Sequence, residues 1–397
     1  MHRLKPLIAA ALLAAAMPGT ARAQEPGSRA EEQARQQEEK ARNLTAYRSP
    51  WIERQMLAIE NAGGFGVARG LFVTFGDIKR GSGIALGPAY GKTFSSGAVV
   101  LTKAAFSISG YKLGQLSVLS PGIAGGRLRF QARGRWQDAP VVKLYALGPD
   151  SSTDRTDYAE TKTEVSGGAT FRPVRLLRFG AGVGVEHFET GIAEGRDPEN
   201  PIFTSMPGAD ADPRYVHARA SAAIDGRDGD GYSRHGSLLQ ATFHDYRQQN
   251  DGPYSFQRLD GVAEQYVPIL HGNWVLYFAL RGSTTTTESG RQVPFFLMPD
   301  LGGHDLRGFA NYRFRDLHSI LATAEYRWYA QEFLEAAVFY DAGKTVPDRK
   351  SLDFDGLKSS IGAGIRFHTP QMTILRLEAT HSREGIRLII AFSAVGQ

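Results

Sequence analysis

The segment ATAEYRWY, residues 322–329, alternates strictly between two kinds of side chain. One face carries Ala322, Ala324, Tyr326 and Trp328, and the other carries Thr323, Glu325, Arg327 and Tyr329. Successive side chains of a β-strand point to opposite faces, so this segment predicts a strand with an apolar face and a polar face. Residues 333–344 repeat the pattern, with Ala336, Val338 and Tyr340 set against Glu335, Phe339 and Asp341. Each strand is expected to turn its apolar face to lipid.

The same period of two extends from about Gly66 to the C-terminal region. Tilted membrane strands need roughly nine to eleven residues or more, and the predicted spans have lengths of this kind. The predicted spans are 66–77, 82–91, 96–108, 111–120, 126–138, 158–172, 174–188, 213–226, 235–248, 255–269, 272–284, 317–330, 333–344, 357–368, 371–382 and 385–393. The pattern therefore predicts an all-β protein, a transmembrane antiparallel β-barrel of about sixteen strands.

Long and short connections alternate between these spans. The long ones are 139–157, 189–212, 285–316 and 345–356, and tight turns are expected at Pro173, 271–272, 331–332 and 369–370. Every long connection follows an odd-numbered strand. Bacterial outer-membrane barrels have short periplasmic turns and long external loops, so the asymmetry predicts this location. In the last strand, Leu388, Ile390 and Phe392 are expected to point outward.

The N-terminal residues have the layout of a secretory signal. Arg3 and Lys5 precede an apolar run at 7–16, and small residues at 21–23 form a cleavage site. We therefore expect a cleavable signal peptide over residues 1–23, a short polar periplasmic segment over 24–65, and the outer-membrane barrel over 66–397. Residues 24–40 have no large apolar side chain with which to build a core.

The composition excludes several kinds of protein. The 397 residues include no Cys, so disulfides and cysteine-bound metals play no part. The formal charge of +5 includes Arg3, Lys5 and Arg22, and subtracting these three leaves +2 for the remainder. This small charge gives no reason to expect nucleic-acid binding.

One motif in the connection 285–316 indicates how that loop is held. The stretch GGHDLRGF, residues 302–309, combines flexible glycines with a single arginine, Arg307. If the loop folds into the lumen, the Arg307 guanidinium needs carboxylate partners, which a planar fork binds through two parallel hydrogen bonds. Glu325 and Asp341 face inward on the next two strands and are the expected partners.

These residues resemble the BamA/TamA superfamily of outer-membrane barrels, also called the bacterial surface antigen family. The resemblance implies that the sixth external loop is folded into the lumen, locked by Leu306, Arg307, Gly308 and Phe309 at its tip and by Glu325, Phe339, Asp341 and Gly343 on the strands. Segments 145–152 and 225–237 are also similar to family members. Residues 24–65 are too short for a POTRA domain, so the chain resembles a short branch of the family without these domains.

The resemblance implies outer-membrane biogenesis or transport, with protein segments or lipid passing through a narrow lumen or a lateral seam between the first and last strands. It implies outer-membrane lipids as partners and an unfolded protein or a lipid as client. The sequence leaves the oligomeric state open. A passive pore or a surface-exposed structural barrel is the alternative.

An enzyme of the outer-membrane lipase type is a weaker alternative, because the pairs 304–305, 318–319 and 381–382 lack a Gly-x-Ser-x-Gly motif. Residues 180–184 imitate a dinucleotide-binding turn but lie inside a strand pattern. Residues 225–231 lack the bidentate Glu of a calcium loop and indicate a periplasmic turn. No catalytic residue, cofactor or metal is expected.

Overall fold

The computed structural model describes residues 70–229, 231–270, 273–331, 333–369 and 373–392. All of them belong to one compact unit, Trp51–Gln397. The predicted signal peptide, almost all of the predicted polar segment and the first residues of the predicted barrel lie outside the described residues. So does the side chain of Phe392.

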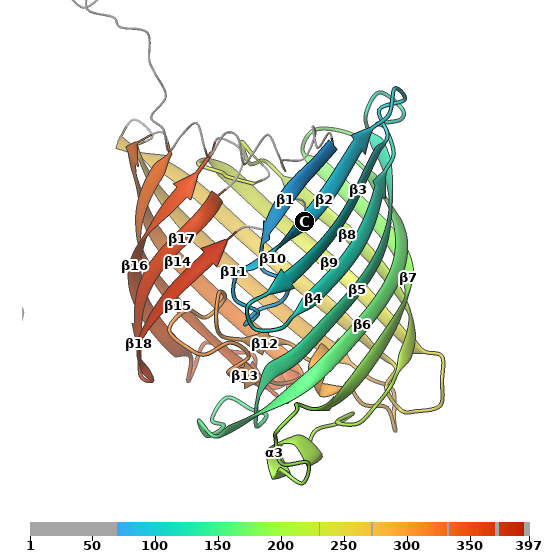
Figure 1. The fold of residues 1–397 in the computed structure, drawn as a ribbon. Coiled ribbons are helices and arrows are strands. Elements are labelled where there is room, and N and C mark those ends of the chain that lie inside the picture. The colour runs from blue at the N-terminus through green and yellow to red at the C-terminus, as the bar shows by residue number, and fades with distance from the viewer. Residues whose placement is uncertain (1–69, 230, 271–272, 332, 370–372, 393–397) are drawn as a thin grey trace, which may run out of the picture. The chain divides into compact units, whose positions relative to one another are not determined.

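Sixteen strands form one antiparallel sheet, in which each strand pairs with its neighbour in the chain. They are β1 (Gly70–Gly76), β2 (Ala85–Thr93), β3 (Val99–Ser107), β4 (Lys112–Leu119), β5 (Leu128–Tyr145), β6 (Arg155–Phe171), β7 (Leu177–Ile192), β8 (Arg214–Asp225), β9 (Gly236–Gln248), β10 (Phe256–Ile269), β11 (Trp274–Thr286), β14 (His318–Gln331), β15 (Leu334–Val346), β16 (Lys358–His368), β17 (Thr373–Ser382) and β18 (Gly385–Phe392). The sheet curls into a barrel (Figure 1). The predicted fold class and strand number are confirmed.

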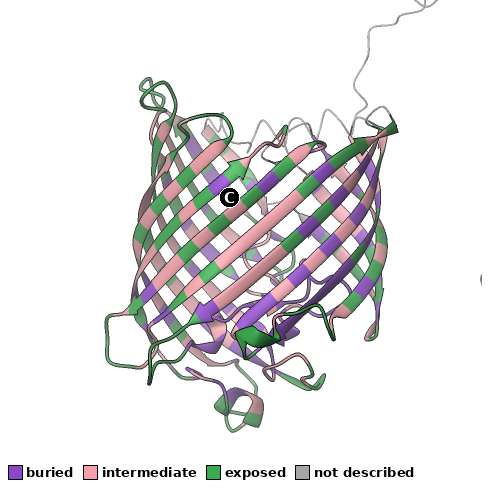
Figure 2. Cartoon of the chain, turned by 180° about the vertical axis from the view of Figure 1, so that it is seen from behind, coloured by how far each residue is buried: buried purple, intermediate pink, exposed green. Residues whose placement is uncertain are grey.

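The faces of the strands alternate as the sequence predicts, and Figure 2 shows the resulting bands of buried and exposed residues. On β14, Thr323, Glu325 and Arg327 are buried inside the barrel, whereas Trp328 is exposed. On β18, Leu388 and Ile390 are among the most exposed large apolar side chains, at 80% and 61%. None of the helices in the described parts of the chain is long and apolar enough to cross a bilayer.

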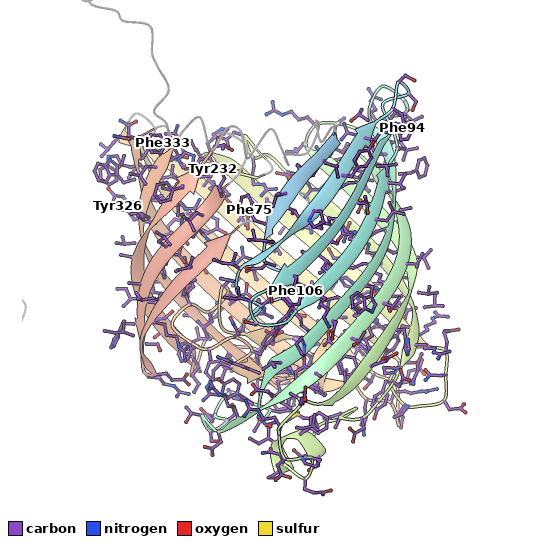
Figure 3. The ribbon with its side chains drawn as sticks, in the orientation of Figure 1. Phe75, Phe94, Phe106, Tyr232, Tyr326 and Phe333 are labelled. Atoms are coloured by element: carbon purple, nitrogen blue, oxygen red, sulfur yellow. The ribbon has the colours of Figure 1, made fainter. Side chains whose placement is uncertain are left out.

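Most of the long connections lie together at one end of the barrel, here called the loop end, and the opposite end is called the turn end (Figure 1). The connection 226–235 at the turn end is an exception, because it is longer than 146–154. The turns predicted at 271–272, 331–332 and 369–370 lie largely outside the described residues. Figure 3 shows Phe94 and Phe333 at the turn end. The long connections are 146–154, 193–213 with α3 (Pro201–Thr204), 287–317 and 347–357 with η3 (Arg349–Ser351). Residues 287–317, called loop 6 below, contain η2 (Phe295–Leu297) and a hairpin of β12 (Asp300–Leu301) and β13 (Phe314–Arg315).

The predicted loop 139–157 is wrong at both of its ends. β5 continues to Tyr145 and β6 begins at Arg155. Pro140 lies where the register between β5 and β6 shifts, between Ala139 and Val142. Such a bulge leaves residues unpaired, so a proline without an N–H is tolerated there.

The sheet has two free edges, β1 and β18. They lie next to each other, but no ladder joins them within residues 70–76 and 385–392. The barrel is therefore nearly closed, with a seam between its first and last strands.

Candidate anchoring site for loop 6 in the barrel lumen

The hairpin of loop 6 folds against the inner wall through a small apolar cluster. Leu306, Phe309 and Phe314 are almost completely buried and pack with Leu301 and with Leu321 of β14. The rings of Phe309 and Phe314 meet edge to face, with centroids 5.1 Å apart. Burying these side chains supplies the main apolar contribution that holds the tip in place.

The guanidinium of Arg307 lies at the centre of the site. Its Nε and Nη2 donate to the two carboxylate oxygens of Asp341, at 2.7 and 2.8 Å. Its Nη1 lies 2.8 Å from Oε1 of Glu325 and 3.4 Å from Oε1 of Glu378. Arg307 is 3% exposed, so these bonds replace water almost entirely.

An aromatic ring also contacts this guanidinium. The Cζ atom of Arg307 lies 3.4 Å from the ring centroid of Phe339, a cation–π contact. The ring is accommodated by Gly362 on β16, because a Cβ there would lie 2.5 Å from Cζ of Phe339. A glycine on a neighbouring strand thus makes room for the ring that covers the arginine.

Glycines let the loop approach the wall closely. Gly308 has a φ of +95°, and a Cβ there would lie 2.8 Å from the Cβ of Ser360. The Gly308 carbonyl accepts a hydrogen bond from the Ser382 hydroxyl at 2.8 Å. At Gly343 an added Cβ would lie 2.7 Å from the Ile320 carbonyl oxygen and 3.0 Å from a methyl group of Leu301.

The structure brings together all eight residues expected from the resemblance and adds others that the sequence analysis missed. Arg366 of β16 donates to both oxygens of Glu325, at 2.9 and 3.0 Å, and to Glu378 at 3.0 Å. Glu335 and Arg327 extend the network further along the wall. The alternation places these side chains inside, but it cannot show which of the inward-facing charges meet.

The electrostatics favour a charged arginine in the loop. Burial alone would lower the pKa of the Arg307 guanidinium, but the bonds to Asp341 and the charges of Glu325 and Glu378 hold this pKa above its ordinary value. A network of buried ion pairs in which the charges are mutually satisfied is costly to break, because removing one charge leaves the others unpaired. The site is suited to holding a loop in position.

Side chains that could suggest an enzyme have other partners. His304 lies 3.4 Å from Asp77, and Nδ1 of His318 is 2.7 Å from the Thr284 hydroxyl. The Ser382 hydroxyl binds the loop, as described above. Among the described residues, His187, Glu189 and Asp212 form a metal-compatible group, but they lie at the exposed loop end, far along the chain from the anchoring site.

Loop 6, a second loop and one turn occupy part of the lumen. Residues 77–84, called loop 1 below, fold against loop 6, and the turn 226–235 reaches inward, where the Tyr232 hydroxyl donates to Glu335 at 2.6 Å. A cavity of about 570 Å³ remains between loop 1, loop 6, this turn and the strands. Arg376 and Ala391, next to the seam, also line it.

Comparison with known proteins agrees with this architecture. Residues 97–382 match the model of the Omp85 superfamily domain. Among solved structures, the fold is similar to BamA from Haemophilus ducreyi lacking POTRA domains 1–3, with a TM-score of 0.60 and 14% identity over 83% of this chain and 70% of that chain. It is also similar to CdiB from Escherichia coli, with a TM-score of 0.53 and 11% identity over 81% of this chain and 60% of that chain.

No curated protein sequence matches the chain. At such low identities the solved structures show a common fold, whereas the family model spans well over half of the chain. The protein therefore belongs to the Omp85 superfamily and is an outer-membrane β-barrel.

Proposed function

We propose that this protein is a biogenesis or transport barrel of the BamA/TamA type, which handles protein segments or lipid at the seam between β1 and β18. Omp85 superfamily barrels act in the insertion or secretion of outer-membrane proteins and are not enzymes. The finer assignment is supported by one observation above all: within residues 70–76 and 385–392, β1 and β18 face each other without pairing, beside a lumen that loop 6 narrows.

The free edges offer the chemistry that such a function requires. β1 and β18 each leave a row of backbone N–H and C=O groups without a ladder, and a strand edge of this kind can pair with another chain. Outward-facing side chains on both edges are apolar, with Leu71 82% and Ile386 76% exposed. A β-strand or a lipid chain entering here would meet hydrogen-bonding groups and apolar contacts together.

Loop 6 is proposed to be a lock that keeps the lumen narrow. Leu306, Arg307, Gly308 and Phe309 form its tip, and Glu325, Phe339, Asp341 and Gly343 form its receptor on the wall. A passive pore needs an open channel, so the bulk of loop 6 in the lumen favours transport at the seam over passive diffusion. A passive pore or structural barrel is the alternative that the experiment below tests.

The proposal includes the rest of the chain. Residues 1–23 are proposed to be a cleaved signal peptide that directs export to the bacterial outer membrane, and residues 24–65 a short periplasmic segment before the barrel. The partners would be outer-membrane lipids and an unfolded protein or a lipid client. Protein clients are the better supported, because they are what superfamily barrels handle.

A disulfide across the seam tests the proposal directly. The chain has no native cysteine, so one cysteine on β1 and one on β18 can form a unique bond in the oxidising periplasm. Cells whose only copy of the protein is the cross-linked barrel should have an altered content of outer-membrane proteins and lipids. Mass spectrometry of the membrane fraction measures this change. Reduction should restore the normal content, and the single-cysteine variants should behave normally.

A passive pore gives the opposite result. Planar-bilayer recordings should then show a large, steady conductance that the disulfide does not alter, and the membrane composition should not depend on the redox state. That outcome would remove the transport proposal in favour of the pore.

A further inference from the structure

We propose that loop 6 is also a clasp, which holds the two free edges of the barrel together at the loop end of the seam. This inference rests on the proposed function, because it supposes that the seam opens. It differs from the anchoring of Arg307 on β15, since the clasp contacts lie on the two elements that flank the seam. Loop 1 directly follows β1, and the short turn 383–384 directly precedes β18.

On the β1 side, the clasp is formed by Arg80 of loop 1. Its guanidinium pairs with Asp300, lies 3.1 Å from Asp305, and donates to the Gly302 carbonyl at 3.2 Å. The guanidinium also lies over the Tyr312 ring, 4.5 Å from its centroid, and the Tyr312 hydroxyl donates to the Arg80 carbonyl at 3.1 Å. Loop 6 therefore holds loop 1 through both its side chain and its backbone.

On the β18 side, the clasp is formed by Arg313 of loop 6. Its Nε donates to Glu384 at 2.6 Å, and this guanidinium is 2% exposed. The remaining nitrogens donate to the hydroxyl and the carbonyl of Ser151 in the connection 146–154, both at 2.8 Å. A second contact comes from Ser382 at the end of β17, which donates to Gly308.

The two halves of the clasp belong to one rigid hairpin. Asp300 pairs with Arg315 and Leu301 with Phe314, and the Gly303 N–H donates to the Phe309 carbonyl at 3.1 Å. Arg307 fixes this hairpin to the wall, so it cannot simply follow either edge. Separating β1 from β18 at the loop end must therefore break the bonds of Arg80 or those of Arg313.

The two contacts differ in strength. The Arg80 side chain is 24% exposed and one of its partners, Asp305, is 41% exposed, whereas Arg313 is almost completely buried. Exposed ion pairs contribute less than buried ones, because water and salt screen them. The geometry points to Arg80 as the contact that releases first, which frees β1 while loop 6 stays with β18.

Distance measurements across the seam test the clasp. Cysteines replacing Val73 on β1 and Ile386 on β18 point outward at exposed positions and can carry nitroxide labels in the full-length protein in lipid nanodiscs. Arg80→Ala and Glu384→Gln should each broaden the distribution of label distances. Arg196→Ala is the matched control, since it breaks a loop-end ion pair with Asp157 that lies away from the seam.

The outcomes separate the clasp from the proposed function. Heat-modifiable gel mobility first identifies the variants that fold, and the two substitutions provide independent tests from the two sides of the seam. Unchanged distances in the folded variants would overturn the clasp whatever the protein transports. A second outcome combines broadened label distances with a membrane composition that the disulfide across the seam does not change. This outcome would support the clasp and overturn the transport proposal.

Discussion

The wall formed by β14 to β17 and the seam between β1 and β18 consist of the same kind of strand but are held very differently. On the wall, continuous ladders are reinforced by ion pairs that join Arg307 of the loop to carboxylates of three different strands. At the seam, the described residues of the short strands β1 and β18 face each other without a ladder. Stability is therefore concentrated on one side of the barrel, so the other side can separate without unfolding the whole barrel.

Replacing Arg307 with alanine should have the largest effect on stability, because it removes the ion pairs that reinforce the wall. The substitution leaves Asp341 and Glu325 buried with less compensating charge, and breaking a buried pair costs about 3–5 kcal/mol. Compared with the natural protein, the variant should lose the gel band of the folded barrel at a lower urea concentration. Proteases should also cleave loop 6 faster.

Arg291→Ala is the control for this experiment. Arg291 belongs to the same loop, but it is exposed and its side chain donates to the Gly252 carbonyl. If the two variants had equal midpoints and equal cleavage rates, the wall would not depend on the anchored arginine, and the contrast with the seam would fail.

Gly343→Ala should have an intermediate effect on the same wall. The new methyl group would press on the Ile320 carbonyl and on Leu301, and overpacking typically costs about 1–3 kcal/mol. Gly282→Ala on β11 is the matched control, because its Cβ would be 3.7 Å from the nearest atom, the Ser319 carbonyl oxygen. The urea midpoint should fall for the first variant and stay unchanged for the second; equal midpoints would contradict close packing of loop 6 on β15.

Asp316 is a buried carboxylate of loop 6 whose replacement should change stability only slightly. This carboxylate, in the return limb of loop 6, makes no ion pair among the described residues, unlike Asp341. Burial raises the pKa of its carboxyl, although the bond from the Leu317 N–H opposes this. The folded protein therefore favours the protonated form and gains stability as the pH falls through the raised pKa.

Asp316→Asn mimics the protonated carboxyl, so it should stabilise the protein slightly at pH 7. The difference in urea midpoint from the natural protein should shrink as the pH approaches the ordinary Asp pKa of about 3.9. A variant that is less stable at pH 7 would show that the carboxylate has a favourable partner after all.

The sequence predicted the walls of the barrel better than the contacts between them. Alternation located β14 and β15 closely, because burial on one face imposes a period of two. The predicted strand 126–138 stops short of the end of β5 at Tyr145, because the bulge between Ala139 and Val142 interrupts the alternation. Glu378 and Arg80 went unrecognised, because alternation shows that a side chain is inside but not which distant charge it meets, and that depends on the path of the loops.

Residue-resolved hydrogen exchange of the folded barrel in nanodiscs tests the central claim most directly, since it measures local opening along every strand. We expect amides of β1 and β18 to exchange orders of magnitude faster than the paired amides of β15. We also expect Arg307→Ala to reduce the protection of β15 much more than that of β1. Equal protection of the seam strands and β15 would contradict the central claim, because the two sides of the barrel would then be equally stable.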